Sequence, residues 1–310
     1  MATVAIDRLE TAMLARARSL GFADADAREL VDHFLGAELR GASGHGVERL
    51  RWVSAFDDLR PAAQPQLVER DGGLARWDAA GALGYLALSR ALERELEDPP
   101  AGARLVVVRH GFPTGRLGHY AERVAAGGLC CLVTATSTAR ISHPAGGPPL
   151  LGTNPLCLAV PGERGPALVD VSMGRITYGA VLKAAATGSR LPAGAAVDAT
   201  GGPATNPADV SAGTAGLLPF GGEQAYKGFA LALLVELLCR ALAGADGFSA
   251  VALIARPQVL PAEEIRAALG ERRFPGDASA ERRRQALAAG TVALPDDLWS
   301  WIEAAPSTDG

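Results

Sequence analysis

Apolar residues recur at helical spacing toward both ends of the chain. Between residues 7 and 39 the pattern predicts two amphipathic helices separated at Gly21-Phe22, with Asp24 or Asp26 as N-cap of the second. A third helix is expected over residues 46–59. The helices predicted near the C-terminus cover residues 263–269, 280–289 and 296–304.

The middle of the chain alternates short apolar segments, typical of strands, with further helices. The predicted strands cover residues 66–69, 74–78, 104–109, 128–136, 156–160, 167–171 and 248–255. The predicted helices cover residues 82–98, 120–126 and 227–242. The last of these is expected to be buried. Residues 185–210 are rich in Gly, Pro and Asp and predict a long excursion over the surface.

This order of elements favours an α/β protein. Helices, then mixed strands and helices, then helices again suit a helical domain built from both chain termini and packed on a central α/β domain. We place the helical domain at residues 1–78 plus 280–310 and the α/β domain at residues 79–279. No Gly-x-Gly-x-x-Gly follows an early strand, so a nucleotide would have to bind to a non-Rossmann fold.

Composition narrows the class of protein. The 310 residues carry a net charge of only −4, which does not indicate a nucleic-acid or anionic membrane partner. The 4 cysteines lack Cys-x-x-Cys spacing and lie in apolar runs, so buried, reduced thiols are expected. Without an export signal or an apolar run of membrane-spanning length, we expect a cytoplasmic protein.

Several kinds of site are excluded by missing motifs. The 5 histidines are scattered without metal-ligand spacing, so no metal site is predicted. The sequence also has no Gly-x-Ser-x-Gly elbow and no phosphate-binding Gly-x-x-x-x-Gly-Lys-Ser/Thr. These absences argue against a zinc enzyme, a serine hydrolase and a P-loop enzyme.

The pair His45 and Arg49 carries the clearest chemical signal. If Gly46 opens a helical turn, residues four apart lie on the same side of it. An imidazole can exchange a proton near neutral pH, and a guanidinium can hold a carboxylate through two parallel hydrogen bonds. The pair suits a substrate with a carboxylate beside a carbonyl or hydroxyl carbon. The alternative is a surface arginine beside a loop histidine.

Other polar residues lie in glycine-flanked loops at strand ends. Thr153 and Asn154 precede a strand, Asp170 ends one, and Asp198 is a lone loop acid; each could contact a ligand or only shape a turn. Residues 274–277 could bind phosphates or form an ordinary loop. Lys227, one of two lysines in the chain, opens an apolar helix and could place a compact ammonium in a site.

Taken in order, these segments resemble the malate/L-lactate dehydrogenase family of non-Rossmann oxidoreductases, and within it the 2,3-diketo-L-gulonate reductases. The resemblance runs from about residue 5 to residue 303 and is clearest at Val169–Gly179. The motifs that carry it are Gly-His-Gly-Val-Glu-Arg, Gly-Arg-Leu-Gly-His-Tyr, Gly-Thr-Asn-Pro, Val-Asp-Val-Ser-Met, Tyr-Lys-Gly-Phe-Ala-Leu and Phe-Pro-Gly-Asp.

The resemblance implies a mixed, largely antiparallel sheet, a homodimer and binding of NAD(H) or NADP(H). It implies that His45 donates the proton, that Arg49 holds the substrate carboxylate and that Asp198 orients the histidine. The residues that it assigns to the cofactor are Ser137, Asn154, Asp170, Ser172, Met173, Gly174, Tyr226, Lys227, Gly276 and Asp277.

Two departures from the family pattern concern the chemistry. Gly44 stands where the family usually has serine, and Pro113 stands where some members have a second histidine. His110 or His119 could replace that histidine if the loop is reshaped. The chain is also shorter than the family, mostly after Gly244.

The resulting hypothesis is an NAD(P)H-dependent enzyme that reduces a small 2-oxo acid to a 2-hydroxy acid, or catalyses the reverse. One alternative is a cyclic imine carboxylate reductase. The other is a repurposed member that catalyses a non-redox step or serves as a binding protein.

Overall fold

In the computed structural model, which describes residues 1–305, a mixed seven-stranded sheet forms the centre of the fold. Its strands are β2 (Gln66–Arg70), β3 (Leu74–Asp78), β4 (Ala103–Arg109), β5 (Cys130–Ala135), β6 (Leu156–Val160), β7 (Ala167–Val171) and β11 (Ser249–Ala255). They lie in the order β2-β3-β4-β11-β5-β6-β7, and only β3 and β4 run parallel. The predicted fold class, a non-Rossmann and largely antiparallel α/β sheet, is confirmed.

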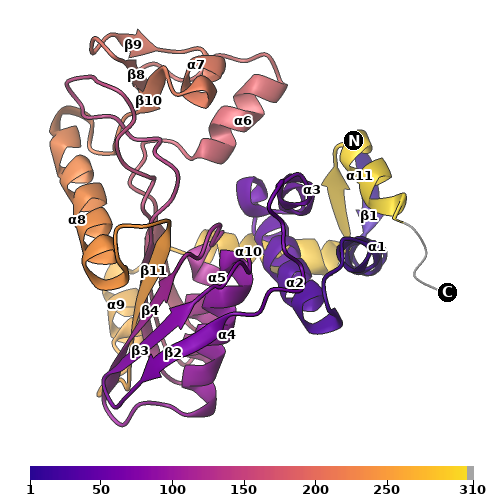
Figure 1. Cartoon of the computed structure of the whole chain (residues 1–310), viewed down its shortest axis with the longest axis vertical. Helices are drawn as coiled ribbons and strands as arrows, with labels where there is room; N and C mark the ends of the chain where they lie inside the picture. Colours follow the sequence, from indigo (N-terminus) through magenta and orange to yellow (C-terminus); the bar gives the residue numbers. More distant parts are fainter. Residues whose placement is uncertain (306–310) are drawn as a thin grey trace.

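Alternating side chains of the sheet enter two different cores. Ala250 and Ala252 of β11 face the layer made by α4 (Gly84–Glu97) and α5 (Leu117–Ala126), whereas Val251 faces α8 (Ala225–Ala243). Figure 1 shows α8 on the opposite side of the sheet from α4 and α5. This alternation follows from the two-residue period of a strand that is covered on both sides.

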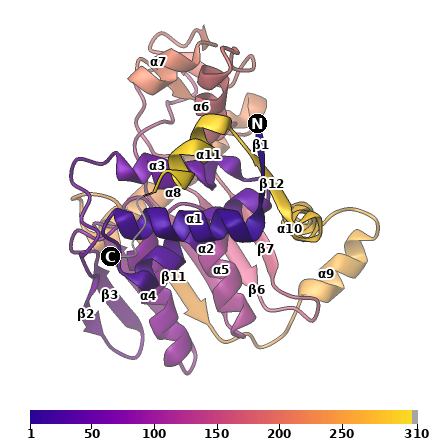
Figure 2. The same ribbon diagram turned by 90° about the vertical axis from the view of Figure 1, so that its right-hand side faces the viewer.

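The two ends of the chain meet in a helical region. Strand β1 (Ala2–Ala5) pairs with β12 (Thr291–Leu294), and Leu9 and Met13 share a core with Leu298 (Figure 2). Ala23, without a side-chain cap, precedes the second helix, so Asp24 lies in its first turn and the predicted cap is wrong. The helices of this region are α1 (Ile6–Ser19), α2 (Asp24–Leu39), α3 (Glu48–Ser54), α10 (Asp277–Ala289) and α11 (Asp296–Glu303).

The predicted surface excursion over residues 185–210 is instead part of a small folded unit. Asn206 accepts a hydrogen bond from the Ala208 amide and Pro207 occupies the first turn, which together start a helix. The unit also holds the sheet β10-β8-β9. Its elements are α6 (Tyr178–Ala186), β8 (Ala196–Asp198), β9 (Pro203–Ala204), α7 (Pro207–Ala212) and β10 (Ala215–Leu217).

Two further expectations need correction. Strands β2 and β3 belong to the central sheet, so the boundary predicted at residue 78 assigns them to the wrong domain. Helix α8 is buried on one side only, because five of its leucines are 37–60% exposed. They are Leu231, Leu233, Leu234, Leu237 and Leu238. Within residues 1–305 no helix is both long and apolar enough to span a membrane.

Candidate active site

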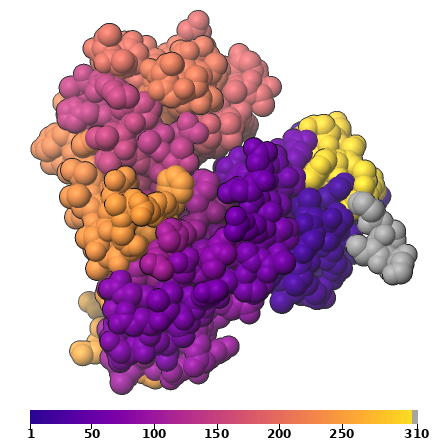
Figure 3. All heavy atoms as spheres, viewed as in Figure 1, coloured from indigo at the N-terminus to yellow at the C-terminus, as the bar shows by residue number. Residues whose placement is uncertain are grey.

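A cavity of about 490 Å³ lies where the helical region, the sheet and the small unit meet. Figure 3 shows the surface indented between the helical region and the unit that contains α6 and α7. The volume is in the range of small-molecule sites. Its lining includes His45, Arg49, Trp52, Tyr85, Phe112, Arg116, Ser137, Arg140, Asp170, Ser172, Tyr178, Gly276, Ser279 and Arg282.

His45 ends a short 3₁₀ turn, η1 (Ser43–His45), that follows α2. A Cβ on Gly46, the next residue, would lie 1.9 Å from a carboxylate oxygen of Glu38, so a larger residue there would displace that side chain. The same carboxylate accepts a hydrogen bond from the Val47 amide. Because the backbone is extended at Gly46, α3 begins at Glu48. The observed helix, Glu48–Ser54, is therefore shorter at both ends than the predicted helix over residues 46–59.

The imidazole of His45 makes no hydrogen bond within residues 1–305 and faces the cavity. Burial, together with the positive charges of Arg49 and Arg116, lowers the pKa of His45 to about 4. A neutral imidazole therefore lines the cavity at pH 7, ready to accept a proton from a bound ligand.

Arg49 lines the same cavity as His45. Its Nε donates to the Gly44 carbonyl oxygen at 2.7 Å, and its guanidinium carbon lies 4.6 Å from the centroid of the Trp52 ring. These two contacts fix the plane of the guanidinium. Its two outer nitrogens have no partner in the described part of the chain, so they can donate two parallel hydrogen bonds to a carboxylate.

The glycine at position 44 has a packing explanation. A Cβ on Gly44 would lie 3.1 Å from the Cα of Gly179, and a Cβ on Gly179 would lie 2.7 Å from the Cα of Gly44. A larger residue at position 179 would thus clash with the His45 turn, and one at position 44 would require the backbone of α6 to shift by a few tenths of an ångström. This contact brings Tyr178 to the wall of the cavity.

Asp170, the penultimate residue of β7, lines the cavity. Its carboxylate accepts a hydrogen bond from the Gly118 amide at 2.9 Å and so places a negative charge at the N-terminus of α5, where the helix dipole stabilises it. Burial raises the pKa of Asp170, although the charge of Arg116 opposes that shift. Arg116 in turn pairs with Glu122 at 3.3 Å.

The residues assigned to a cofactor divide into three groups. Ser137, Asp170, Ser172 and Gly276 line the cavity. Asn154, Met173, Gly174 and Asp277 do not line the cavity. Asn154 donates to the Ala232 carbonyl oxygen and to Glu236, both at 2.9 Å, and Asp277 pairs with Arg266. Tyr226 and Lys227 lie outside it, on the exposed start of α8.

Asp198 does not orient His45 in this structure. Its carboxylate accepts hydrogen bonds from the Thr200 amide at 2.8 Å and the Gly202 amide at 2.9 Å, which close the turn after β8. Neither His110 nor His119 takes the place of the second histidine that some family members have at the position of Pro113. His110 pairs with Asp78 and His119 with Glu29, and neither lines the cavity.

The wall offers features that fit a nicotinamide cofactor. Ser137, Ser172 and Ser279 line the cavity, and Arg116 and Arg282 supply positive charge. At Gly276 the chain passes so close to β7 that a Cβ would lie 2.6 Å from the Leu168 carbonyl oxygen. Polar donors, cations and a close backbone approach suit a phosphate-bearing ligand. Among residues 1–305, no cluster of three His, Cys, Asp or Glu could hold a metal ion.

Comparisons with known proteins identify the family. The chain is 35% identical over 229 residues to a Δ1-pyrroline-2-carboxylate/Δ1-piperideine-2-carboxylate reductase of Pseudomonas putida, covering 72% of this chain and 66% of that protein. It is 32% identical to a (2R)-3-sulfolactate dehydrogenase (NADP(+)) of Chromohalobacter salexigens, covering 80% and 74%. These relatives correct the expectation that 2,3-diketo-L-gulonate reductase is nearest.

A solved structure has the same fold. The malate dehydrogenase of Entamoeba histolytica superposes with a TM-score of 0.87 at 20% identity, covering 97% of this chain and 96% of that one. The family model described as malate/L-lactate dehydrogenase matches residues 4–265. The chain therefore belongs to the malate/L-lactate dehydrogenase family of oxidoreductases.

Proposed function

We propose that this protein interconverts a small 2-hydroxy acid and the matching 2-oxo acid with NAD(H) or NADP(H). The observation that carries the proposal is the presence of His45 and Arg49 in one cavity. The imidazole nitrogens of His45 and the two outer nitrogens of Arg49 have no hydrogen-bond partner among residues 1–305. Relatives named as sulfolactate and malate dehydrogenases act on acids of this class.

In the proposed mechanism, Arg49 binds the substrate carboxylate with its two outer nitrogens. That places the neighbouring carbon and its oxygen beside His45. During oxidation the neutral imidazole of His45 accepts the hydroxyl proton; during reduction its conjugate acid returns the proton to the oxygen. A nicotinamide cofactor, when bound, would supply or accept the hydride. Ser137, Ser172, Gly276 and Ser279, with Arg116 and Arg282, would hold it.

A cyclic imine carboxylate is the second candidate, and the cavity wall favours it. Trp52, Phe112, Pro113 and Tyr178 give part of the wall an apolar, mostly aromatic surface that suits a small ring. A protonated imine also brings its own proton, so a neutral His45 would not hinder its reduction. The reductase from Pseudomonas putida is named for such substrates.

The cofactor part of the proposal is tested by titrating the protein with NADH and NADPH while following nicotinamide fluorescence. Micromolar binding of either supports an oxidoreductase and identifies its cofactor. Absence of binding at millimolar concentration contradicts the proposal and favours a repurposed member with a non-redox activity or a binding role.

We further propose that the protein forms a homodimer through the outer face of α8 and the neighbouring sheet surface. On β11, β5 and β6 the cross-strand neighbours Leu253, Leu132 and Leu158 are 42%, 37% and 41% exposed. With the exposed leucines of α8, they make an apolar surface of a kind that marks interaction sites.

Replacing Leu234 and Leu237 together with glutamate is expected to convert the dimer to a monomer. Two charges placed in an apolar contact would have to be desolvated without partners. Light scattering after size-exclusion chromatography should show a fall from twice the chain mass of 31.9 kDa to that mass. Leu287→Glu, at an exposed leucine on α10, is the control and should leave the dimer intact. A monomeric wild-type protein would contradict this proposal.

A further inference from the structure

Tyr85, on the first turn of α4, is the one tyrosine on the cavity wall that the core otherwise encloses. Its side chain and backbone are only 1% exposed. Its hydroxyl makes no hydrogen bond within residues 1–305, but the hydroxyl oxygen is not completely sealed from solvent. The hydroxyl is therefore reached through the open space that Tyr85 lines, which is the cavity.

The ring of Tyr85 is held in place from behind. It packs edge-on against the rings of His33 and Phe34, each with centroids 4.9 Å away. Gly115, with φ of +66°, passes so close that a Cβ would lie 2.3 Å from Cε1 of Tyr85. Aromatic neighbours on two sides and a backbone on a third leave the ring one position, so its hydroxyl has a fixed direction.

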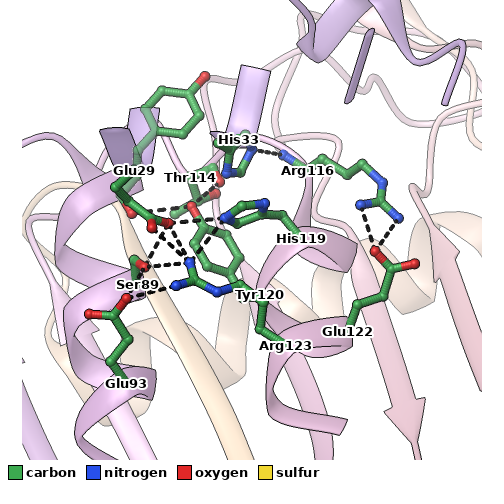
Figure 4. Close-up of polar contacts among 11 residues, drawn as sticks. Glu29, His33, Ser89, Glu93, Thr114, Arg116, His119, Tyr120, Glu122 and Arg123 are labelled. Atoms are coloured by element: carbon green, nitrogen blue, oxygen red, sulfur yellow. Dashed lines mark hydrogen bonds and ion pairs between the residues drawn. The ribbon is translucent and has the colours of Figure 1, made fainter. Parts of the chain in front are cut away.

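A polar network fixes the residues that hold this ring (Figure 4). His33 Nε2 accepts a hydrogen bond from the Arg116 amide at 3.0 Å, and burial keeps the pKa of His33 well below its ordinary value. Tyr120 donates to the Thr114 carbonyl oxygen at 2.8 Å. Glu29 joins His119 at 3.0 Å and Arg123 at 2.7 Å. The network ties α2 and α5 to the loop 114–116 that lines the cavity.

Burial raises the pKa of Tyr85, while the nearby charge of Arg49 works in the opposite direction. The phenol is thus protonated throughout the physiological range and can act as a neutral donor. Tyr85 and Arg49 both line this cavity, so a single ligand bound in it can contact both residues.

We propose that the Tyr85 hydroxyl donates a hydrogen bond to the substrate carboxylate that Arg49 binds. The pair would combine a charged fork with one directed neutral donor, so the carboxylate is held in one rotation about its bond to the reacting carbon. This inference rests on the proposed function only in the identity of the ligand, a planar 2-carboxylate. It makes Tyr85 a substrate-binding residue.

The test compares Tyr85→Phe with wild type in the binding of pyridine-2-carboxylate, measured by calorimetry in the presence of the cofactor that the protein binds. Since a hydrogen bond to a charged group is lost, the Kd should rise about tenfold to hundredfold. The neutral probe pyridine-2-carboxamide should bind wild type and variant alike. Turnover should show a higher KM with kcat changed less than about threefold.

Thermal unfolding separates this role from a structural one. Tyr85→Phe removes a hydroxyl without a protein partner, so the melting temperature should stay within about 2 °C of wild type. Tyr120→Phe is the matched variant, since it removes a buried hydroxyl that bonds Thr114, and it should lower the melting temperature by several degrees.

A Kd for pyridine-2-carboxylate within twofold of wild type would overturn the inference, as would failure of the wild type to bind that probe. If carboxylate binding depends on Tyr85 but no cofactor oxidation occurs with any substrate, the inference stands and the proposed function fails.

Discussion

Replacing His45 with alanine is expected to lower kcat/KM for 2-hydroxy acid oxidation by about 10²–10⁴-fold, because it removes the imidazole that takes the hydroxyl proton in the proposed mechanism. The Kd for the cofactor should stay within about threefold of wild type, since the imidazole contributes nothing to phosphate binding. Steady-state absorbance of the reduced nicotinamide gives the rates, and fluorescence titration gives the Kd. Unchanged turnover would contradict the assigned role.

The pH profile of the wild type provides an independent check on His45. The pKa of about 4 means that the base form of the free enzyme predominates above that pH. Oxidation kcat/KM should therefore rise through about pH 4 and stay level from pH 5 to 8, whereas 2-oxo acid reduction should fall as the pH rises. With a cyclic imine, His45→Ala should cost less than about tenfold, which distinguishes the two candidate substrates.

Replacing Arg49 with alanine is expected to lower kcat/KM by about 10²–10³-fold, chiefly through KM. The substrate carboxylate would lose a charged, two-point partner in a partly buried site, a change typically worth several kcal/mol. Arg49→Lys keeps the charge but loses the planar fork and its packing on Trp52, so a loss of about tenfold to hundredfold is expected.

Arg94→Ala serves as the matched control for Arg49. Arg94 lies on α4 and pairs with Glu97 on the exposed surface, so its loss should leave KM unchanged. Pyridine-2-carboxamide, which lacks the charge, should bind wild type and Arg49→Ala equally. If Arg49→Ala raises the Kd for the amide as much as that for the carboxylate, the arginine shapes the cavity instead of binding the carboxylate.

Much of the fold could be predicted from the sequence because its strands are short apolar runs bounded by turn residues. β6 and β7 were predicted at their observed bounds. The strands β1 and β12 were missed, since each is only four residues long and gains stability by pairing with a segment almost 290 residues away. Helix α8 was expected to be buried because its sequence is apolar, yet apolar composition cannot distinguish a core from an uncovered interface.

The site was predictable to a lesser degree. His45 and Arg49 line the same cavity, as their spacing predicts, but they do not lie on one continuous helix. His45 ends a 3₁₀ turn, and the guanidinium of Arg49 is directed back to the Gly44 carbonyl oxygen. Tyr85 was missed because it lies in an apolar helix where a tyrosine is normally a core residue. Arg140 and Arg282 reach the cavity only through tertiary packing, and no local motif marks them.

The most direct test of the proposed reaction is transfer of deuterium from NADPH or NADH labelled at C4 of the nicotinamide. The proteins would be incubated with a 2-oxo acid series and with Δ1-pyrroline-2-carboxylate, and the products analysed by mass spectrometry. The proposal predicts deuterium at the carbon next to the carboxylate, at a rate that His45→Ala or Arg49→Ala reduces. If the wild type oxidises neither labelled cofactor with any of these acids, the reductase assignment is wrong.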